Sequence, residues 1–294
     1  MDFMSKSKIF FAISILIIIA GLITMAVSGL NFGIDFTGGT LLQIDFGKEV
    51  PVEEVREITN DIDPNASVIY AGTNNEQVII KTTKSMDNAA RKEFFSKFKE
   101  KYDLEDEALV QSQIFGPSIG QEIRRKAIIS VLIATIGMLI YITFRFEFKF
   151  GISAIIALIH DVLIALTIYA LLRIPVNSSF VAAMLTIVGY SINDTIVVFD
   201  RIRENLKIMK KDKYSHIVNT SISQTISRSI NTSFTTLLAI VTLYVLGVEA
   251  IKDFALPLIV GVLAGTYSSI FIASPVWTLL KVKVGGKKIN TNRA

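Results

Sequence analysis

Long apolar stretches divide the chain and decide what it can fold into. A helix needs about 20 predominantly apolar residues to cross the roughly 30 Å hydrocarbon layer of a membrane. Hydrophobic residues make up 51% of the 294 residues and charged residues only 19%, and the apolar residues concentrate in stretches of that length. These stretches are residues 9–28, 127–144, 151–172, 180–199, 229–246 and 254–280. The sequence therefore predicts an α-helical polytopic membrane protein with six transmembrane helices.

The first stretch resembles a cleavable signal peptide, because Lys6 and Lys8 precede it and small residues end it. Its apolar region is longer than the roughly 7–15 residues of a signal peptide. We therefore expect an uncleaved membrane span.

The distribution of Lys and Arg predicts the orientation, because short cytoplasmic loops carry an excess of these residues. The N-terminus and residues 281–294 are basic, as are residues 200–228, which we predict to be a loop; turns 173–179 and 247–253 carry one cation each. A basic cluster at residues 124–126 opposes this assignment, but long segments translocate largely regardless of charge. We expect both termini in the cytoplasm and a location in a bacterial-type cytoplasmic (inner) membrane. The net charge of +4 then reflects anchoring to membrane lipid of the inner leaflet. The basic residues 200–228 either serve this contact alone or also contact a partner, and nothing indicates nucleic acid.

Residues 31–122, between the first and second spans, have the pattern of one small soluble domain. Alternating apolar residues predict strands, a Pro followed by acidic residues predicts the start of one helix, and Ser85 is placed to cap a second. The predicted strands are 41–46, 67–71, 77–82 and 108–114, and the predicted helices are 51–61 and 85–102. This β-α-β-β-α-β order predicts an α+β ferredoxin-like extracytoplasmic domain. The chain has no cysteine, so this domain must be stable without disulfides.

These patterns divide the chain into four parts. We expect residues 1–30 to form the cytoplasmic N-terminus and first transmembrane helix, and residues 31–125 to form the extracytoplasmic domain. Residues 126–280 are expected to form a five-helix transmembrane bundle, and residues 281–294 a basic cytoplasmic tail.

Asp194 lies inside the fourth apolar stretch, where a carboxylate is costly and usually functional. Asp161 follows His160 inside the third stretch, and Arg228 precedes the fifth. A buried carboxylate can be held neutral by desolvation or charged by a nearby guanidinium, so it can gain and lose a proton. At about 1.5 Å per helical residue, Asp194 and Arg228 lie at depths that a long Arg side chain can bridge. We predict that Asp194 carries a proton and that making or breaking an Asp194–Arg228 pair repacks the two helices.

The same residues also have a simpler interpretation. A polar residue in a membrane bundle can serve only to hydrogen-bond a neighbouring helix, a contact that stabilises the bundle by about 0.6 kcal/mol on average. Asn193, which we include in the candidate proton site because it precedes Asp194, fits that role as well. His160 either orients Asp161 as a buried neutral imidazole or takes part in a proton relay.

Two further groups of residues indicate structural roles. Asp200, Arg201 and Arg203 begin the cytoplasmic segment after the fourth span and predict a local cluster of ion pairs. Gly261 and Gly265 have the small-xxx-small spacing that permits close contact between membrane helices.

Four strings at the membrane boundaries closely resemble, in order and spacing, the SecF subunits of the SecDF family, which assists protein export through the SecY channel. These are FGIDFTGGT (residues 32–40), His160-Asp161, GYSINDTIVVFDRIREN (189–205) and SRSINTSFTTLL (227–238). The resemblance covers nearly the whole chain and implies membership of the RND superfamily. RND bundles usually comprise twelve spans in two related halves, so this chain would form one half bundle and SecD the other.

The resemblance also implies a function and partners. It implies an accessory subunit of the Sec translocase that works with SecD and uses the proton-motive force to promote preprotein export. The implied partners are SecD, the SecYEG channel, YajC-type and YidC-type accessory proteins, and the translocating preprotein.

The string FGIDFTGGT has two interpretations. It can be a tight turn between membrane and strand, with Gly38 and Gly39 supplying unusual backbone angles. The resemblance implies instead that the segment couples the outer domain to the bundle, with Asp35, Thr37, Gly38 and Gly39 at the hinge.

Other functional classes fit the sequence less well. An RND-type proton-coupled exporter of small hydrophobic molecules or lipids normally has two large outward domains, and this chain has one small one. An intramembrane aspartyl protease would carry Tyr-Asp and Gly-x-Gly-Asp signatures, which are absent. The chain has no phosphate-binding loop and only two histidines, His160 and His216, so we expect no cofactor, no metal and no catalytic site.

Overall fold

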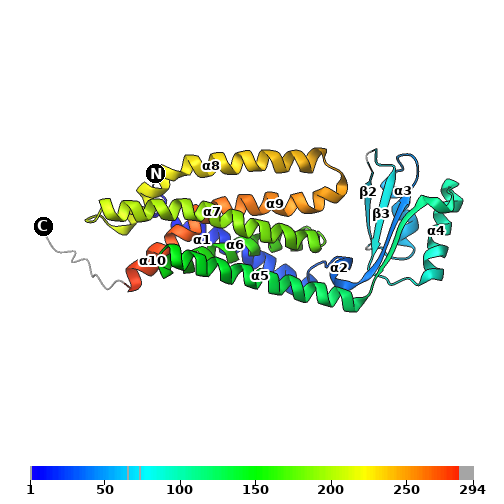
Figure 1. The fold of residues 1–294 in the computed structure, drawn as a ribbon, viewed down its shortest axis with the longest axis horizontal. Coiled ribbons are helices and arrows are strands. Elements are labelled where there is room, and N and C mark those ends of the chain that lie inside the picture. Colours follow the sequence, from blue (N-terminus) through cyan, green and yellow to red (C-terminus); the bar gives the residue numbers. More distant parts are fainter. Residues whose placement is uncertain (1, 65, 73, 285–294) are drawn as a thin grey trace.

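The computed structural model describes residues 2–64, 66–72 and 74–284 as an elongated molecule, with a helix bundle at one end and a small mixed domain at the other (Figure 1). Within these residues, six helical segments are long and apolar enough to cross a membrane. Five are single helices: α1 (Ser7–Ser28), α5 (Pro117–Arg145), α6 (Phe148–Leu171), α7 (Ser178–Ile208) and α8 (Tyr214–Leu246). The sixth consists of α9 (Glu249–Ser268), the π-helical turn η2 (Ser269–Ala273) and α10 (Ser274–Val284). The six predicted membrane helices are confirmed.

The prediction that residues 200–228 form a loop is wrong, because most of them are helical. Helices α7 and α8 both continue well beyond the apolar stretches and are joined only by residues 209–213. Polar contacts support these extensions, because Asn205 on α7 donates to Ser221 Oγ and Gln224 Oε1 on α8, each at 2.8 Å. A hydropathy pattern indicates which residues lie in the hydrocarbon layer. It does not indicate where a helix ends after it has left the membrane.

Helix α5 likewise begins ten residues before the apolar stretch that predicted it, at Pro117 rather than 127. Pro117 occupies the first helical turn, where its missing N–H costs nothing. Glu122 and Lys126 form an i,i+4 ion pair of 2.7 Å on this extension. Strand β4 (Leu109–Phe115) therefore leads into a membrane helix through the single residue Gly116.

The bundle is closely packed around α6, α7 and α9. Trp277, Phe150 and Phe199 form one aromatic core, in which the Phe150 and Trp277 rings stack at 4.8 Å between centroids. A methyl group on Gly261 would come within 2.0 Å of Ile187 on α7, and one on Gly265 within 2.9 Å of Ser191. These glycines therefore allow α9 to approach α7, as their spacing predicts.

The outer domain is a four-stranded antiparallel sheet with strand order β2-β3-β1-β4. Its first three strands are β1 (Gly39–Asp45), β2 (Ser67–Ala71) and β3 (Gln77–Thr82). Helices α3 (Val52–Asn60) and α4 (Asn88–Tyr102) cover the face of the sheet remote from the bundle (Figure 1). Phe94 and Phe98 of α4 are buried in one hydrophobic core with Leu42 and Ile80 of the sheet. A short turn, η1 (Asp106–Ala108), precedes β4. The predicted ferredoxin-like topology is confirmed.

The cap of α4 differs from the prediction. Asp87, and not Ser85, precedes the helix, and its carboxylate accepts a hydrogen bond of 2.8 Å from the backbone N–H of Ala90. Asp and Ser are both preferred at the N-cap of a helix, so residue preference alone could not show which of the two positions caps α4.

The segment that joins α1 to the sheet contains a helical turn, α2 (Ile34–Thr37), which the sequence did not predict. Gly38 and Gly39 follow it with φ angles of 80° and 147°, as expected for glycines in unusual backbone angles. A methyl group on Gly39 would lie 2.1 Å from the carbonyl oxygen of Thr82 on β3. The two glycines therefore let the chain pass tightly between the sheet and the membrane helices.

Candidate functional site in the bundle

Asp194 is a buried carboxylate with an unused hydrogen-bonding oxygen. Its side chain is 6% exposed, and Oδ2 has no hydrogen-bond partner within the described chain. Ser229 on α8 faces it, and the Ser229 hydroxyl is likewise buried and without a partner that meets hydrogen-bond geometry. Unsatisfied polar groups in a membrane bundle are costly and point to function.

The expected Asp194–Arg228 ion pair is not formed in this structure. Arg228 is exposed and lies beyond the 4 Å of an ion pair, although it is near enough to act electrostatically on the carboxylate. Successive residues of an α-helix differ by about 100° in direction. Because Ser229 points toward Asp194, Arg228 points away from the bundle.

Helix α8 carries a ladder of buried hydroxyl groups that passes Asp194. Four hydroxyl residues recur every fourth position on its buried face: Ser221, Thr225, Ser229 and Ser233. At one end of the ladder, Ser221 accepts from Asn205; at the other, Ser233 shares a 2.5 Å hydrogen bond with Thr266 on α9. Ser221 and Thr225 donate to backbone carbonyls of their own helix, whereas the Ser229 hydroxyl beside the unsatisfied carboxylate remains without a partner within the described chain.

An uncovered polar face lies beside Asp194. Asn193 is exposed on α7, in line with the exposed small residues Gly189 and Thr186 one and two turns away. Asn231 and Arg228 are exposed on the neighbouring helix α8. Polar side chains on the outside of membrane helices require a protein or water-filled environment, so this face fits contact with another membrane protein.

His160 and Asp161 on α6 form a separate, fully bonded site. Asp161 Oδ1 lies 3.0 Å from His160 Nδ1, and Oδ2 accepts from Ser191 at 2.6 Å and from Ser268 at 2.9 Å. His160 Nε2 lies 3.0 Å from Ser14 Oγ on α1. The pair thereby ties four membrane helices together at one depth.

The π-turn η2 lies directly beside this network. Ser269 Oγ lies 2.8 Å from Thr195 Oγ on α7 and donates to the carbonyl of Gly265 at 2.8 Å. A π-turn widens a helix locally and is frequent at functional sites. Sequence reasoning missed Ser14 and Ser268 as members of the site; the signal was several serines inside otherwise apolar stretches.

The predicted hinge segment is bonded to the helix that carries Asp194. Asp35 Oδ2 accepts a 2.8 Å hydrogen bond from the backbone N–H of Ser178, the first residue of α7. Gly33 donates to the carbonyl of Val176 at 2.8 Å, and Thr37 bonds only within its own turn, to the carbonyls of Gly33 and Gly38. The outer end of α7 is therefore held by the segment that enters the outer domain.

A second connection joins the sheet to the same helix end. Lys81 on β3 forms an ion pair of 3.7 Å with Asp253 on α9, and Asn177, which caps α7, donates to Asp253 at 3.1 Å. The outer domain thus contacts the N-terminus of α7 through two independent sets of polar groups.

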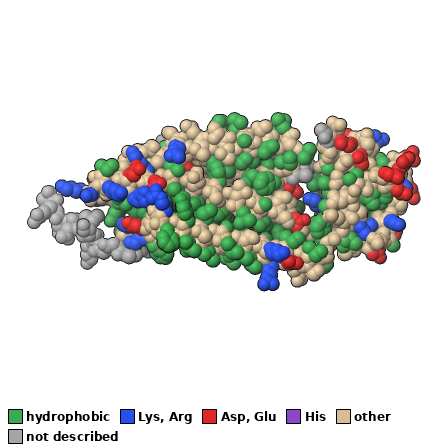
Figure 2. Space-filling model, viewed as in Figure 1, with side chains coloured by type: hydrophobic (Ala, Val, Ile, Leu, Met, Phe, Trp, Pro, Cys, Tyr) green, Lys and Arg blue, Asp and Glu red, His purple; other side chains and the backbone are tan. Residues whose placement is uncertain are grey.

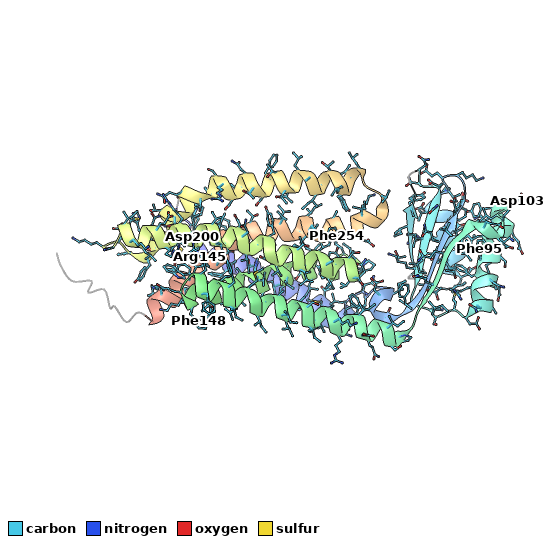
Figure 3. The ribbon with its side chains drawn as sticks, in the orientation of Figure 1. Phe95, Asp103, Arg145, Phe148, Asp200 and Phe254 are labelled. Carbon is cyan, nitrogen blue, oxygen red and sulfur yellow. The ribbon has the colours of Figure 1, made fainter. Side chains whose placement is uncertain are left out.

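The ion-pair cluster around Asp200 has different members from the predicted one. Asp200 pairs with Arg203 at 2.9 Å and with Arg145, the last residue of α5, at 3.9 Å; Figure 3 shows Arg145 and Asp200 at the same end of the bundle. Arg201 bonds instead to Glu204 and Gln224, each at 2.7 Å.

Two family models match the chain where these features lie. The model for the C-terminal part of the protein export membrane proteins SecD and SecF matches residues 95–283, and the model for the SecD/SecF GG motif matches residues 23–50. The chain belongs to the SecD/SecF family. The GG-motif match contains Asp35, Gly38 and Gly39, and the larger SecD/SecF match contains Asp161 and Asp194, the two buried carboxylates of the bundle.

Relatives that match nearly the whole chain are similar to it at about 40% identity. The protein translocase subunit SecF of Desulfurispirillum indicum is 43% identical over 90% of this chain and 86% of its own length. The SecDF subunit of Bacillus subtilis is 38% identical over 95% of this chain, which spans only 38% of that longer protein.

The fold is also that of solved SecDF structures. The crystal structure of SecDF from Thermus, described as a translocon-associated membrane protein, matches with a TM-score of 0.83 and 36% identity. The match covers 96% of this chain and 39% of the Thermus chain. A super-membrane-facing form of SecDF matches with a TM-score of 0.74 over the same shares.

Proposed function

We propose that this protein is a SecF-type accessory subunit of the Sec translocase that works with SecD to promote preprotein export. Membership of the SecD/SecF family and the SecF names of its full-length relatives support this assignment. The observation that carries it is Asp194, a buried carboxylate with an unsatisfied oxygen beside an uncovered polar face. SecYEG, the preprotein, and YajC-type and YidC-type proteins are the further partners of this proposed role.

The uncovered face of α7 and α8 is the proposed contact with SecD. The exposed Asn193, Arg228 and Asn231 would be costly in lipid and are satisfied if a second bundle covers them. Covering the face also excludes lipid from Asp194, so the proton site is completed only in the assembled pair.

The proposed driving step is proton binding and release at Asp194. The hydroxyl of Ser229, unbonded within the described residues, lies beside the carboxylate and can exchange a proton with it, and Arg228 stabilises the charged form of the carboxylate electrostatically. Each elementary charge that crosses 100 mV releases about 2.3 kcal/mol, enough to shift a two-state equilibrium about 50-fold. A changed charge at Asp194 alters the packing of α7 against α8.

The outer end of α7 transmits this change to the outer domain. Asp35 and the Lys81–Asp253–Asn177 contacts hold that end to the segment and sheet outside the membrane. We assign His160 and Asp161 to holding the helices in register, because every oxygen of Asp161 already has a partner.

The proposed orientation places both termini in the cytoplasm and the ferredoxin-like domain outside. The basic residues at the end of the bundle remote from that domain support it (Figure 2). Because the chain has no cysteine, single cysteines at exposed Lys84 and Lys211 can report sidedness. A membrane-impermeant thiol reagent is expected to label Lys84→Cys in spheroplasts and Lys211→Cys in inverted vesicles; the reverse pattern would refute the orientation.

Preprotein import into inverted membrane vesicles tests the function. Vesicles with SecD and this chain are expected to import a preprotein faster than vesicles with SecD alone, and an uncoupler should remove the difference. An enhancement that persists with the uncoupler would refute proton coupling, and no enhancement at all would refute the export role.

A further inference from the structure

A basic pocket lies at the end of the bundle remote from the outer domain. It has a volume of about 360 Å³ and lies between the α7–α8 hairpin and α10. Four lysines line it: Lys210, Lys211, Lys213 and Lys281. No part of the proton-coupling mechanism uses this pocket.

The charges of the pocket are unbalanced. Within the described chain, Lys210, Lys211 and Lys213 have no acidic partner within ion-pair distance, whereas Lys281 pairs with Glu147 at 2.5 Å. Asp212 is the acidic residue in the lining, and His216 lies 3.9 Å from it. Even with Asp212 counted against one of the three lysines, these side chains leave the cavity with a net positive charge, which favours an anionic ligand.

The floor of the pocket is apolar. Leu206, Met209 and Ile217 line it together with Tyr214, whose ring makes an edge contact with Trp277 at 6.0 Å between centroids. Ile208 and Val282 beside it are 77% and 58% exposed, which is unfavourable in water. A cationic rim over an apolar and aromatic floor matches a phosphate group attached to acyl chains.

The depth of the pocket fits the same ligand. Lys281, which lines the pocket, pairs with Glu147 in the turn between α5 and α6, so this side of the pocket lies at the ends of those two membrane helices. The hairpin lysines lie farther out, and their long side chains can bend back toward a headgroup.

The chain's own tail does not complement this pocket. Residues 285–294 contain Lys287, Lys288 and Arg293 and no acidic side chain. Like charges therefore disfavour occupation of the pocket by residues 285–294.

We propose that this pocket binds the headgroup of an anionic phospholipid of the inner leaflet. Lys210, Lys211 and Lys213 contact its phosphate, and an acyl chain lies along Met209 and Ile217. The proposal rests on the orientation given above. It is independent of Asp194, because lipid binding is measured without export.

The single tryptophan of the chain is a built-in probe for this site. Trp277 is the one Trp, and its ring lies 5.9 Å from Lys281 Nζ. Brominated acyl chains quench Trp fluorescence at short range. The full chain is reconstituted in vesicles that contain a small fraction of brominated phosphatidylglycerol or of brominated phosphatidylcholine with the same acyl chains.

The proposal predicts stronger quenching by brominated phosphatidylglycerol than by brominated phosphatidylcholine. The combined variant Lys210→Gln, Lys211→Gln, Lys213→Gln should lose this preference, with about tenfold or more weaker half-saturation. The matched control, Lys48→Gln, Lys84→Gln, Lys92→Gln, removes three exposed lysines of the outer domain and should keep it.

Three results would overturn the proposal. One is equal quenching by the two lipids in the wild type, and another is an unchanged preference in the hairpin variant. The third is relief of quenching by millimolar glycerol phosphate or by an acidic peptide, which would identify a soluble anion or an acidic protein segment as the ligand.

Discussion

Asp194 and Asp161 are both buried in the membrane bundle, but their surroundings differ, and this difference supports the different roles proposed for them. Asp161 is bonded to His160, Ser191 and Ser268, whereas Asp194 Oδ2 has no partner within the described chain. The sequence predicted both as ionisable groups in spans, because each interrupts an apolar stretch. It could not separate them, since the hydroxyl partners come from helices far apart in the chain. For the same reason it predicted Arg228 as a direct partner of Asp194 and overlooked Ser229.

Substitution at these two positions should separate structure from function. Asp161→Asn is expected to lower the stability of the detergent-solubilised protein by about 1–3 kcal/mol, because it disturbs three buried hydrogen bonds. Asp194→Asn should change stability little, because Oδ2 has no bond to lose. Thermal unfolding of both purified variants measures this, and equal destabilisation would contradict the assignment of different roles.

Among the elements, α7 has the central position. It carries Asp194, packs closely on α9 and α8, and is bonded at its outer end to the segment before the sheet. Hydropathy predicted the apolar core of each helix, and alternation predicted the strands of the outer domain, because both patterns follow from burial. Features set by individual polar contacts and turn geometry, which leave no apolar pattern, were missed or misplaced: the extensions of α7 and α8, the helical turn α2 and the cap of α4.

Close packing of α7 on α9 depends on Gly261. Gly261→Val would force branched carbons into the position of Ile187 and should lower the yield and thermal stability of the folded protein by a cost typical of overpacking, about 1–3 kcal/mol. Gly137→Val on α5 is the control, because nothing lies within 4 Å of its added carbon. Similar behaviour of the two variants would show that the close α7–α9 contact is not required.

At the scale of the whole molecule, the membrane bundle that contains the proposed proton site is linked to a compact domain beside it. The order of membrane spans and strands predicted the SecD/SecF topology. It also predicted that the segment with Gly38 and Gly39 lies between the first span and the first strand. The contacts that link the parts were not, because Asp35 meets Ser178 and Lys81 meets Asp253 only in the folded chain. The proposed transmission runs through these contacts.

Removing one connection should uncouple the outer domain without dismantling the bundle. Asp35→Ala removes the hydrogen bond to the start of α7 and is expected to reduce the proton-dependent part of export severalfold while SecD still co-purifies. Asp45→Ala is a matched control, because this carboxylate bonds only within the outer domain, to Gly47 and Gln77. If Asp35→Ala still gives the full proton-dependent enhancement of export, the Asp35–Ser178 hydrogen bond takes no part in transmitting a change from the bundle to the outer domain.

The central claim is that Asp194 carries the proton that drives export. The most direct test compares preprotein import into inverted vesicles containing SecD and either the wild-type chain or Asp194→Asn, with and without an uncoupler. We predict that the variant co-purifies with SecD but imports at the uncoupled rate under both conditions. Normal uncoupler-sensitive enhancement by Asp194→Asn would contradict the claim and place the proton path elsewhere in the complex.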